Sequence, residues 1–213
     1  MSSTMEYRPF GRLEWQASAL GFGTMRLPVI DDDPAWIDES EAKRMIRYAI
    51  DHGVNYVDTA YPYHGEACEP FLGRALQDGY RERVKLATKL PTWLIESEAD
   101  FGRLLESQLE RLQTDHIELY LLHGLNRKRW PLVRDLGVLT WAEDALSKGS
   151  IGYLGFSFHD EYDLFKEIVD ATALWTFCQI QYNFMDVDFQ AGTKGLKYAN
   201  ENGLAVVVME PIR

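Results

Sequence analysis

The chain alternates short apolar runs with longer amphipathic segments, and this alternation restricts its fold more than any other feature. The run LAVVVM at residues 204–209 has no polar position. A strand that is apolar throughout is typical of a parallel sheet covered on both faces, because a sheet with one solvent face alternates. Residues 39–52 instead place apolar side chains three or four positions apart, which predicts a helix.

The alternation predicts seven strands and six helices, in units of about 30 residues, the size of a βα pair. The predicted strands are residues 19–25, 54–58, 84–89, 117–123, 152–156, 177–181 and 204–209. The predicted helices are residues 39–52, 66–77, 98–113, 132–148, 161–171 and 191–202, with Gly137 as a candidate break in the fourth.

This order of elements predicts an α/β fold of the TIM (β/α)8-barrel type. A closed barrel of this type has eight βα units and about 250 residues, whereas the 213 residues here supply seven strands. We therefore expect a barrel lacking the eighth βα unit, as a single domain over residues 1–213 that is C-terminally incomplete. Residues 5–17 are expected to form a short hairpin across the bottom of the barrel.

Charge and composition exclude several classes of partner. A net charge of −11 repels phosphate backbones and anionic lipid, so no nucleic-acid or membrane partner is expected. No run approaches the roughly 18 apolar residues of a membrane span, and the N-terminus lacks a signal sequence, which predicts a cytoplasmic protein. Cys68 and Cys178 lie far apart, so neither a disulfide framework nor a metal site is predicted.

Ionisable side chains stand where the predicted strands end. Asp58, Lys89 and His123 close the second, third and fourth strands, and Tyr63 follows five residues after Asp58. The carboxyl ends of barrel strands meet at one mouth, where the active sites of such barrels lie. We therefore expect these four side chains to converge on one pocket.

The four residue types suit the protonation of a carbonyl oxygen. A tyrosine with a pKa near 10 donates its proton poorly, and a neighbouring ammonium group lowers that pKa. A buried carboxylate keeps the lysine charged, and a histidine can orient the substrate oxygen. No serine or cysteine at a strand end suits acyl transfer, and no second acid lies opposite Asp58 for glycoside hydrolysis.

Six short motifs occur in order, each at or next to a predicted strand end. They are residues 21–25 (GFGTM), 57–63 (VDTAYPY), 87–89 (ATK), 121–123 (LLH), 155–157 (GFS) and 179–183 (QIQYN). With these motifs the chain resembles the aldo-keto reductase superfamily over nearly its whole length. Residues 48–66, 156–160 and 206–213 are most similar to a bacterial and archaeal subgroup that often carries a C-terminal ferredoxin-like iron–sulfur domain. The cysteines of that domain are not in this chain.

The resemblance implies a role for each matching residue. Tyr63 matches the general acid, Lys89 and Asp58 its pKa-lowering partners, and His123 the residue that orients the substrate. The implied cofactor is NADP(H) or NAD(H), and the implied substrate is a small-molecule carbonyl compound. The residues that would contact the cofactor are Gly23, Thr24, Met25, Asp58, Ser157, Gln179 and Glu210.

Some positions depart from the family pattern or stay open. Phe158 stands where the family usually has an asparagine that binds the carboxamide, and Glu210 stands near the usual place of a stacking aromatic residue. His159 is either a helix cap or a cofactor contact, and Trp93 either lines the substrate pocket or packs. His64, beside Tyr63, is expected to be a loop residue.

Three functional hypotheses follow. The first is an NAD(P)H-dependent reductase of aldehydes or ketones, with Tyr63 as the general acid. The second is a nicotinamide-binding redox or regulatory module, which would work with an iron–sulfur partner. The third is an inactive, incomplete fragment of a longer reductase. A homo-oligomer is compatible with each of them.

Overall fold

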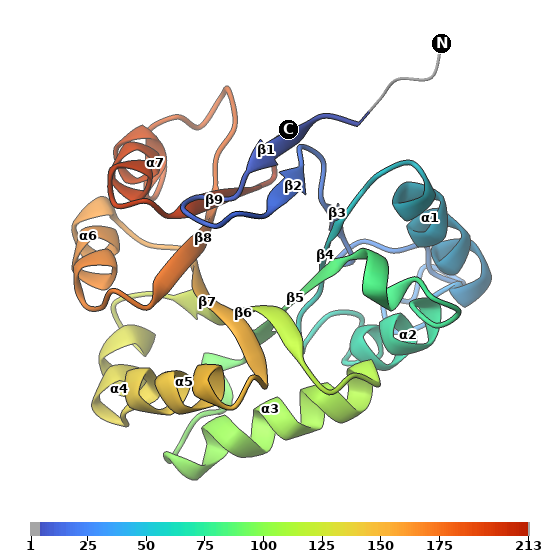
Figure 1. The fold of residues 1–213 in the computed structure, drawn as a ribbon, viewed down its shortest axis with the longest axis horizontal. Coiled ribbons are helices and arrows are strands. Elements are labelled where there is room, and N and C mark those ends of the chain that lie inside the picture. Colours follow the sequence, from blue (N-terminus) through green and yellow to red (C-terminus); the bar gives the residue numbers. More distant parts are fainter. Residues whose placement is uncertain (1–4, 213) are drawn as a thin grey trace.

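The computed structural model describes residues 5–212, so residues 1–4 and 213 lie outside the description. Seven parallel strands form one sheet in chain order. They are β3 (Phe22–Gly23), β4 (Tyr56–Asp58), β5 (Lys85–Leu90), β6 (Ile117–Leu125), β7 (Ile151–Phe158), β8 (Trp175–Gln181) and β9 (Ala205–Met209). The sheet curls around a central axis with the helices outside it (Figure 1). The predicted TIM-type barrel lacking one βα unit is confirmed.

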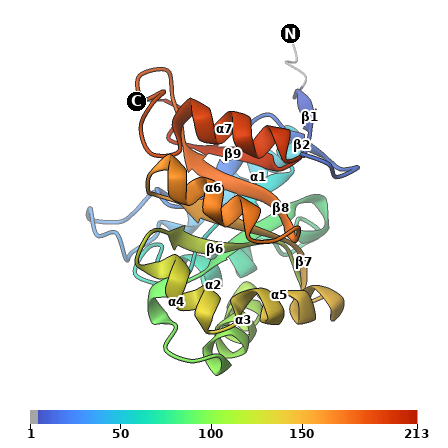
Figure 2. The same cartoon turned by 90° about the vertical axis from the view of Figure 1, so that its left-hand side faces the viewer.

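Seven helices cover the outer face of the sheet, as the side view in Figure 2 also shows for α4, α6 and α7. They are α1 (Glu39–Asp51), α2 (Cys68–Ala75), α3 (Ala99–Leu112), α4 (Arg129–Asp135), α5 (Val138–Ser147), α6 (Tyr162–Asp170) and α7 (Gly192–Glu201). Within residues 5–212 none of the helices combines the length and the apolar character needed to cross a membrane.

The predicted elements are found with shifted ends. The single helix predicted for residues 132–148 is two helices, because Gly137 adopts a left-handed backbone with φ 86° between α4 and α5. The strand predicted for residues 19–25 is reduced to the two residues of β3. Two short 3-10 turns, Arg81–Arg83 and Thr92–Leu94, were not predicted.

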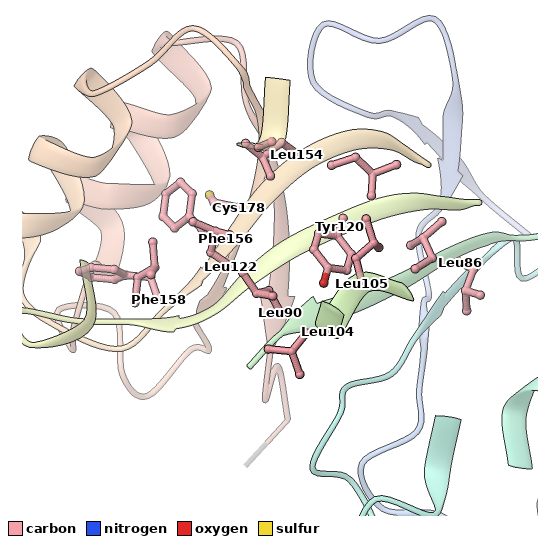
Figure 3. Close-up of a cluster of buried hydrophobic side chains, with 14 of the residues drawn as sticks. Leu86, Leu90, Leu104, Leu105, Tyr120, Leu122, Leu154, Phe156, Phe158 and Cys178 are labelled. Atoms are coloured by element: carbon pink, nitrogen blue, oxygen red, sulfur yellow. The ribbon is translucent and has the colours of Figure 1, made fainter. Parts of the chain in front are cut away.

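The main core lies between the sheet and the helices. Outward-facing side chains of the strands pack there against the apolar faces of the helices. Figure 3 shows part of this cluster, with Leu86, Leu90, Leu104, Leu105, Tyr120, Leu122, Leu154, Phe156, Phe158 and Cys178. Strand β9 differs from the sequence prediction of a strand covered on both faces, because Val208 is 37% exposed. The reason is its place at the end of the strand order, with β8 as its one neighbour among the described strands.

A short hairpin closes the bottom of the barrel, as the sequence predicts for residues 5–17. It is formed by β1 (Tyr7–Pro9) and β2 (Gln16–Ser18), which lie between β9 and β3 in Figure 1. Phe10 is 5% exposed and packs among inward-facing strand residues, including Tyr56 and Phe177. The hairpin therefore fills the interior from the amino-terminal ends of the strands.

The hairpin is attached near each end of the strand order, at the starts of β8 and β4. The guanidinium of Arg12 donates to the backbone oxygens of Ala173 and Trp175, at 2.8 and 3.0 Å, just before and at the start of β8. Just before β4, the side chain of Asn55 accepts a hydrogen bond from the amide of Ser18 at 2.7 Å. A Cβ atom on Gly11 would lie 2.5 Å from the backbone nitrogen of Ala205, so only glycine allows this close approach.

Candidate active site

Lys89 connects the predicted catalytic residues at the carboxyl-terminal mouth of the barrel. Its Nζ donates to Asp58 Oδ1 at 2.6 Å, to the backbone oxygen of Thr59 at 2.7 Å and to the Tyr63 hydroxyl at 3.3 Å. The side chain is 1% exposed, so its charge is held among these acceptors rather than in water. The structure therefore brings Asp58, Tyr63 and Lys89 together, as the sequence predicts.

Strand parity explains why these side chains meet. Side chains two positions apart on a strand share a face, so Tyr56 and Asp58 of β4 both point into the barrel. The Tyr56 hydroxyl donates to Asp58 Oδ2 at 3.3 Å, and Gln179 Nε2 of β8 donates to the same oxygen at 3.2 Å. Both Asp58 oxygens thus accept hydrogen bonds, Oδ1 from Lys89 of β5 and Oδ2 from its own strand and from β8, which fixes the carboxylate toward Lys89.

The environment keeps Lys89 charged and Tyr63 protonated. Burial by itself would lower the pKa of Lys89, but Asp58 and Tyr63 beside it raise that pKa above its usual value. Burial raises the pKa of Tyr63, the Lys89 ammonium opposes this, and the Asp58 carboxylate raises it further. This corrects one expectation, because Asp58 raises the pKa of Tyr63 instead of lowering it. The net pKa of Tyr63 is above its ordinary value.

His123 lies beside this group as a neutral imidazole. Its ring is 6.4 Å from the ring of Tyr63 and 5.0 Å from that of Trp93, measured between centroids. Burial lowers the pKa of His123 well below its usual value, and the charges of Lys89 and Arg129 contribute. The buried Nδ1 atom has no hydrogen-bond partner among the described residues. A neutral imidazole can donate one N–H to a ligand.

These side chains open onto a cavity of about 450 Å³. Its lining comes from the end of β6, the start of α4 and the segments that follow β3, β4, β5 and β7. The residues that line it are Met25, Pro62, Tyr63, His64, Trp93, His123, Gly124, Arg129 and His159. The volume is in the range of small-molecule sites, so a substrate can reach Tyr63 and His123 together.

Two predicted cofactor residues have hydrogen-bonding capacity that a carboxamide can use. Gln179 is 5% exposed, and its Oε1 has no partner among the described residues. The Ser157 hydroxyl oxygen accepts from the backbone amide of Gly124 at 2.7 Å, which leaves its hydrogen for another acceptor. The pair therefore offers one acceptor and one donor, which fits the amide group of a nicotinamide.

The residues at and after the end of β3 differ in exposure, since two border open space and one is buried. A Cβ on Gly23 would meet no atom within 4 Å, and Met25 is 57% exposed, so both border open space. Thr24 is buried, and its amide and its Oγ1 both bond the backbone oxygen of Asp58 at 2.9 Å. Its hydroxyl donates to the protein, so Thr24 can face a cofactor only through its remaining atoms.

Residues at the other side of the mouth differ in position. Phe158 is fully buried and packs on Phe165 at 5.2 Å between centroids, so it offers nothing polar to the cavity. His159 borders the cavity. Glu210 follows the last residue of β9 with a φ of 53°. Burial lowers the pKa of His159, while a hydrogen bond with Gln190 and the charge of the Glu210 carboxylate oppose this shift.

His64 and Trp93 have contrasting surroundings. His64 Nδ1 contacts the backbone oxygen of Pro34 at 2.7 Å, and its Nε2 accepts from the amide of Leu27 at 3.2 Å. His64 therefore fastens the loop after β3, which agrees with the prediction of a loop residue. Trp93 is 39% exposed and lines the cavity, so its ring forms part of the pocket wall.

A buried polar network behind β5 was not predicted. Gln108 of α3 donates to Glu69 Oε1 at 2.6 Å and to the backbone oxygen of Lys89 at 3.1 Å. It accepts from the Tyr120 hydroxyl at 2.6 Å, while Thr88 donates to Glu69 at 2.7 Å. The network holds β5 from outside, at the residue whose side chain reaches the site from inside. A glutamate and a glutamine on apolar helix faces were the available signal.

Arg129 is the cavity residue that the sequence reasoning missed. It is the first residue of α4, six positions after His123, and its guanidinium is 5.2 Å from the ring centroid of Trp93. Its place just past a predicted strand end was the available signal, but the neighbouring Arg127 and Lys128 made the segment resemble a charged surface turn.

Comparison with known proteins gives the family. A sequence model of the Aldo/keto reductase family matches residues 19–213. This chain belongs to the aldo/keto reductase family. This family member is 31% identical over 155 residues to a probable aldo-keto reductase of Glycine max. The alignment covers 69% of this chain and 43% of that protein.

Solved aldo-keto reductases have the same fold. The holo form of AKR11C1 from Bacillus halodurans superposes with a TM-score of 0.80 at 30% identity, covering 97% of this chain and 66% of that one. An aldo-keto reductase from Klebsiella pneumoniae in complex with NADPH superposes with a TM-score of 0.75 at 26% identity, covering 95% and 66%. This aldo/keto reductase chain thus spans between 43% and 66% of the length of these relatives.

Proposed function

We propose that this aldo/keto reductase reduces aldehyde or ketone carbonyls with NADPH or NADH, with Tyr63 as the general acid. The observation that carries the proposal is the position of Lys89 Nζ, which contacts both Asp58 Oδ1 and the Tyr63 hydroxyl beside an open cavity. Family membership and the NADPH complex of the Klebsiella relative support the cofactor. The free polar groups of Gln179 and Ser157 would hold its carboxamide.

The residues around the cavity divide the reaction between them. One N–H of the neutral His123 ring donates to the carbonyl oxygen and holds the substrate beside Tyr63. When bound, the nicotinamide supplies the hydride that forms the new C–H bond. The carbonyl π bond breaks as Tyr63 transfers its proton to the oxygen. The product is an alcohol.

Lys89 contributes most when the proton leaves Tyr63. The hydroxyl is protonated in the free protein at neutral pH, because the ordinary pKa of tyrosine is near 10 and burial raises it further. As the phenolate forms, the ammonium 3.3 Å away stabilises its negative charge, an interaction stronger in the transition state than before it. Tyr63 then recovers its proton from water through the open cavity.

The test compares two tyrosines of one loop. Tyr63→Phe removes the proton donor, and we expect kcat/KM for an aldehyde to fall by about 10²- to 10⁴-fold. Tyr61→Phe is the matched control, because its ring packs against Arg111 at 4.6 Å and lies outside the cavity lining. Absorbance of NADPH or NADH with a panel of aldehydes is the measurement. Equal rates for Tyr63→Phe and wild type would contradict the proposed role.

A further inference from the structure

The lining of the cavity differs in charge from the molecule as a whole. The chain has a net charge of −11, yet none of the residues that line the cavity is a carboxylate. The lining contains one permanently charged side chain, that of Arg129. A site inside an acidic protein that presents a guanidinium and no carboxylate attracts anions locally.

Arg129 has donors to spare. Within residues 5–212 its guanidinium makes one hydrogen bond, from Nη1 to the backbone oxygen of Gly124 at 3.2 Å, and no ion pair. A guanidinium has five N–H donors in a planar fork, which suits a carboxylate or a phosphate. By contrast, the adjacent Arg127 has its Nε 3.6 Å from the carboxylate of Asp160.

The guanidinium is also fixed in place. It lies over the Trp93 ring, 5.2 Å from the centroid, and Trp93 in turn lies 5.0 Å from the His123 ring. A Cβ on Gly124 would come within 2.8 Å of Arg129 Nη1, so the glycine makes room for the guanidinium. A cation that is held by an aromatic ring loses little freedom when it binds an anion.

These groups determine which way round a substrate can lie in the cavity. Tyr63 and His123 form the reacting pair, and the Trp93 ring lies 5.0 Å from the His123 ring and 5.2 Å from the Arg129 guanidinium. We propose that the substrate is a carbonyl compound bearing a carboxylate or phosphate, which Arg129 binds while the carbonyl group lies at Tyr63 and His123. The inference rests on the proposed reductase function. An aromatic or extended linker between the two groups would lie along Trp93.

The experiment uses two aldehydes that differ in one charge. 4-Carboxybenzaldehyde is an anion at neutral pH, and its methyl ester is neutral with the same ring. We expect wild type to prefer the acid, and Arg129→Met to lower the ratio of the two kcat/KM values by about 10- to 100-fold. Arg129→Lys should keep part of the ratio, because it retains the charge but not the fork. Added salt should reduce the preference of wild type.

Arg127→Met is the matched control, since Arg127 is a neighbouring arginine outside the cavity lining, and its ratio should equal that of wild type. An Arg129→Met variant that lowers kcat/KM for both aldehydes alike would overturn the inference in favour of a packing role. The inference would also be wrong if the variant weakened NADPH binding and left the ratio unchanged, because Arg129 would then bind a cofactor phosphate.

Binding of the two aldehydes, followed by calorimetry on wild type and Arg129→Met, separates this inference from the reductase proposal. Turnover of both aldehydes without preference for the acid would leave the reductase function and remove the anion site. Absence of turnover, with Arg129-dependent binding of the acid alone, would remove the function and leave the anion site. Absence of both turnover and Arg129-dependent binding would overturn both.

Discussion

The ammonium group of Lys89 influences more of the site than the atoms it touches. It donates to three oxygen atoms, and its charge also helps to keep the neighbouring His123 unprotonated. A protonated His123 would put a second buried cation beside Lys89. The folded chain therefore stabilises the neutral imidazole, and this makes the free energy of folding depend on pH.

Acid should destabilise the fold through His123. The pKa of His123 is well below 6.5 in the folded chain and returns to about 6.5 on unfolding. Between these two pKa values His123 is protonated in the unfolded chain and neutral in the folded chain. The free energy of unfolding therefore falls as the pH drops below 6.5. We expect wild type to lose up to about 1.4 kcal/mol per pH unit more than His123→Gln over that range.

Urea unfolding at about pH 7.5 and about pH 5.5 measures the difference. His52→Gln is the control, because His52 is an exposed histidine at the end of α1, far from the buried site. Identical slopes for wild type and His123→Gln would show that His123 does not resist protonation in the folded chain.

For single residues, the sequence predicts the catalytic side chains better than the side chains that contact them. Asp58, Lys89 and His123 could be placed because each ends an apolar strand, and the ends of parallel strands converge. The second hydrogen bond to Asp58 comes from Tyr56, whose ring looks like an ordinary core residue in a strand pattern. Arg129 was missed because the sequence does not show which cation of the run Arg127, Lys128 and Arg129 turns toward the cavity.

At the scale of elements, β5 is held on both faces by polar groups. Lys89 points inward to the site, while Thr88 points outward to Glu69 and Gln108 of the neighbouring helices. Burial raises the pKa of Glu69, while hydrogen bonds from Thr88 and Gln108 oppose this. Helices α2 and α3 thus locate the strand through hydrogen bonds as well as apolar packing.

Removing Gln108 should weaken this attachment. Gln108→Leu leaves the Tyr120 hydroxyl and the Lys89 backbone oxygen without their side-chain partner, so we expect a loss of about 1 to 3 kcal/mol in unfolding free energy. Chemical denaturation is the measurement, and Glu106→Leu on the exposed side of the same helix is the control. A Gln108→Leu protein as stable as the control would show that the network contributes nothing net.

The elements themselves were predictable because their patterns are strong, but their ends and this network were not. The spacing of apolar residues in α3 identifies the helix and places Gln108 on a buried face. It does not reveal the partners of Gln108, which come from α2, β5 and β6 and are distant in the sequence. The break at Gly137 was a candidate because glycine readily takes the left-handed backbone observed there.

At the scale of the molecule, the amino-terminal hairpin closes the bottom of the barrel. Phe10 joins an inner cluster made from five strands, including Ala87, Leu121 and Ala205. Arg12 and Ser18 then attach the hairpin to the starts of β8 and β4. The interior of the barrel is therefore packed at the bottom and open at the mouth.

Removing the buried ring of Phe10 from the hairpin should destabilise the barrel. Phe10→Ala removes a buried aromatic ring whose centroid is 4.9 Å from that of Trp15 and 5.6 Å from that of Phe177, and we expect a loss of about 3 to 5 kcal/mol. Thermal and urea unfolding report the change. Trp36→Ala is the control, because Trp36 is 60% exposed in the loop after β3. Equal stabilities would mean that the hairpin covers the barrel without supporting it.

The same attachment sets an order of events during synthesis. Arg12 is separated from Trp175 by 163 positions, so the ribosome must add that many residues before this hydrogen bond can form. At about 5 to 20 residues per second, the interval is roughly 8 to 30 s. The Ser18–Asn55 contact spans only 37 positions, so it can form well before the Arg12 contact. The first segment to be translated is thus among the last to complete its native contacts.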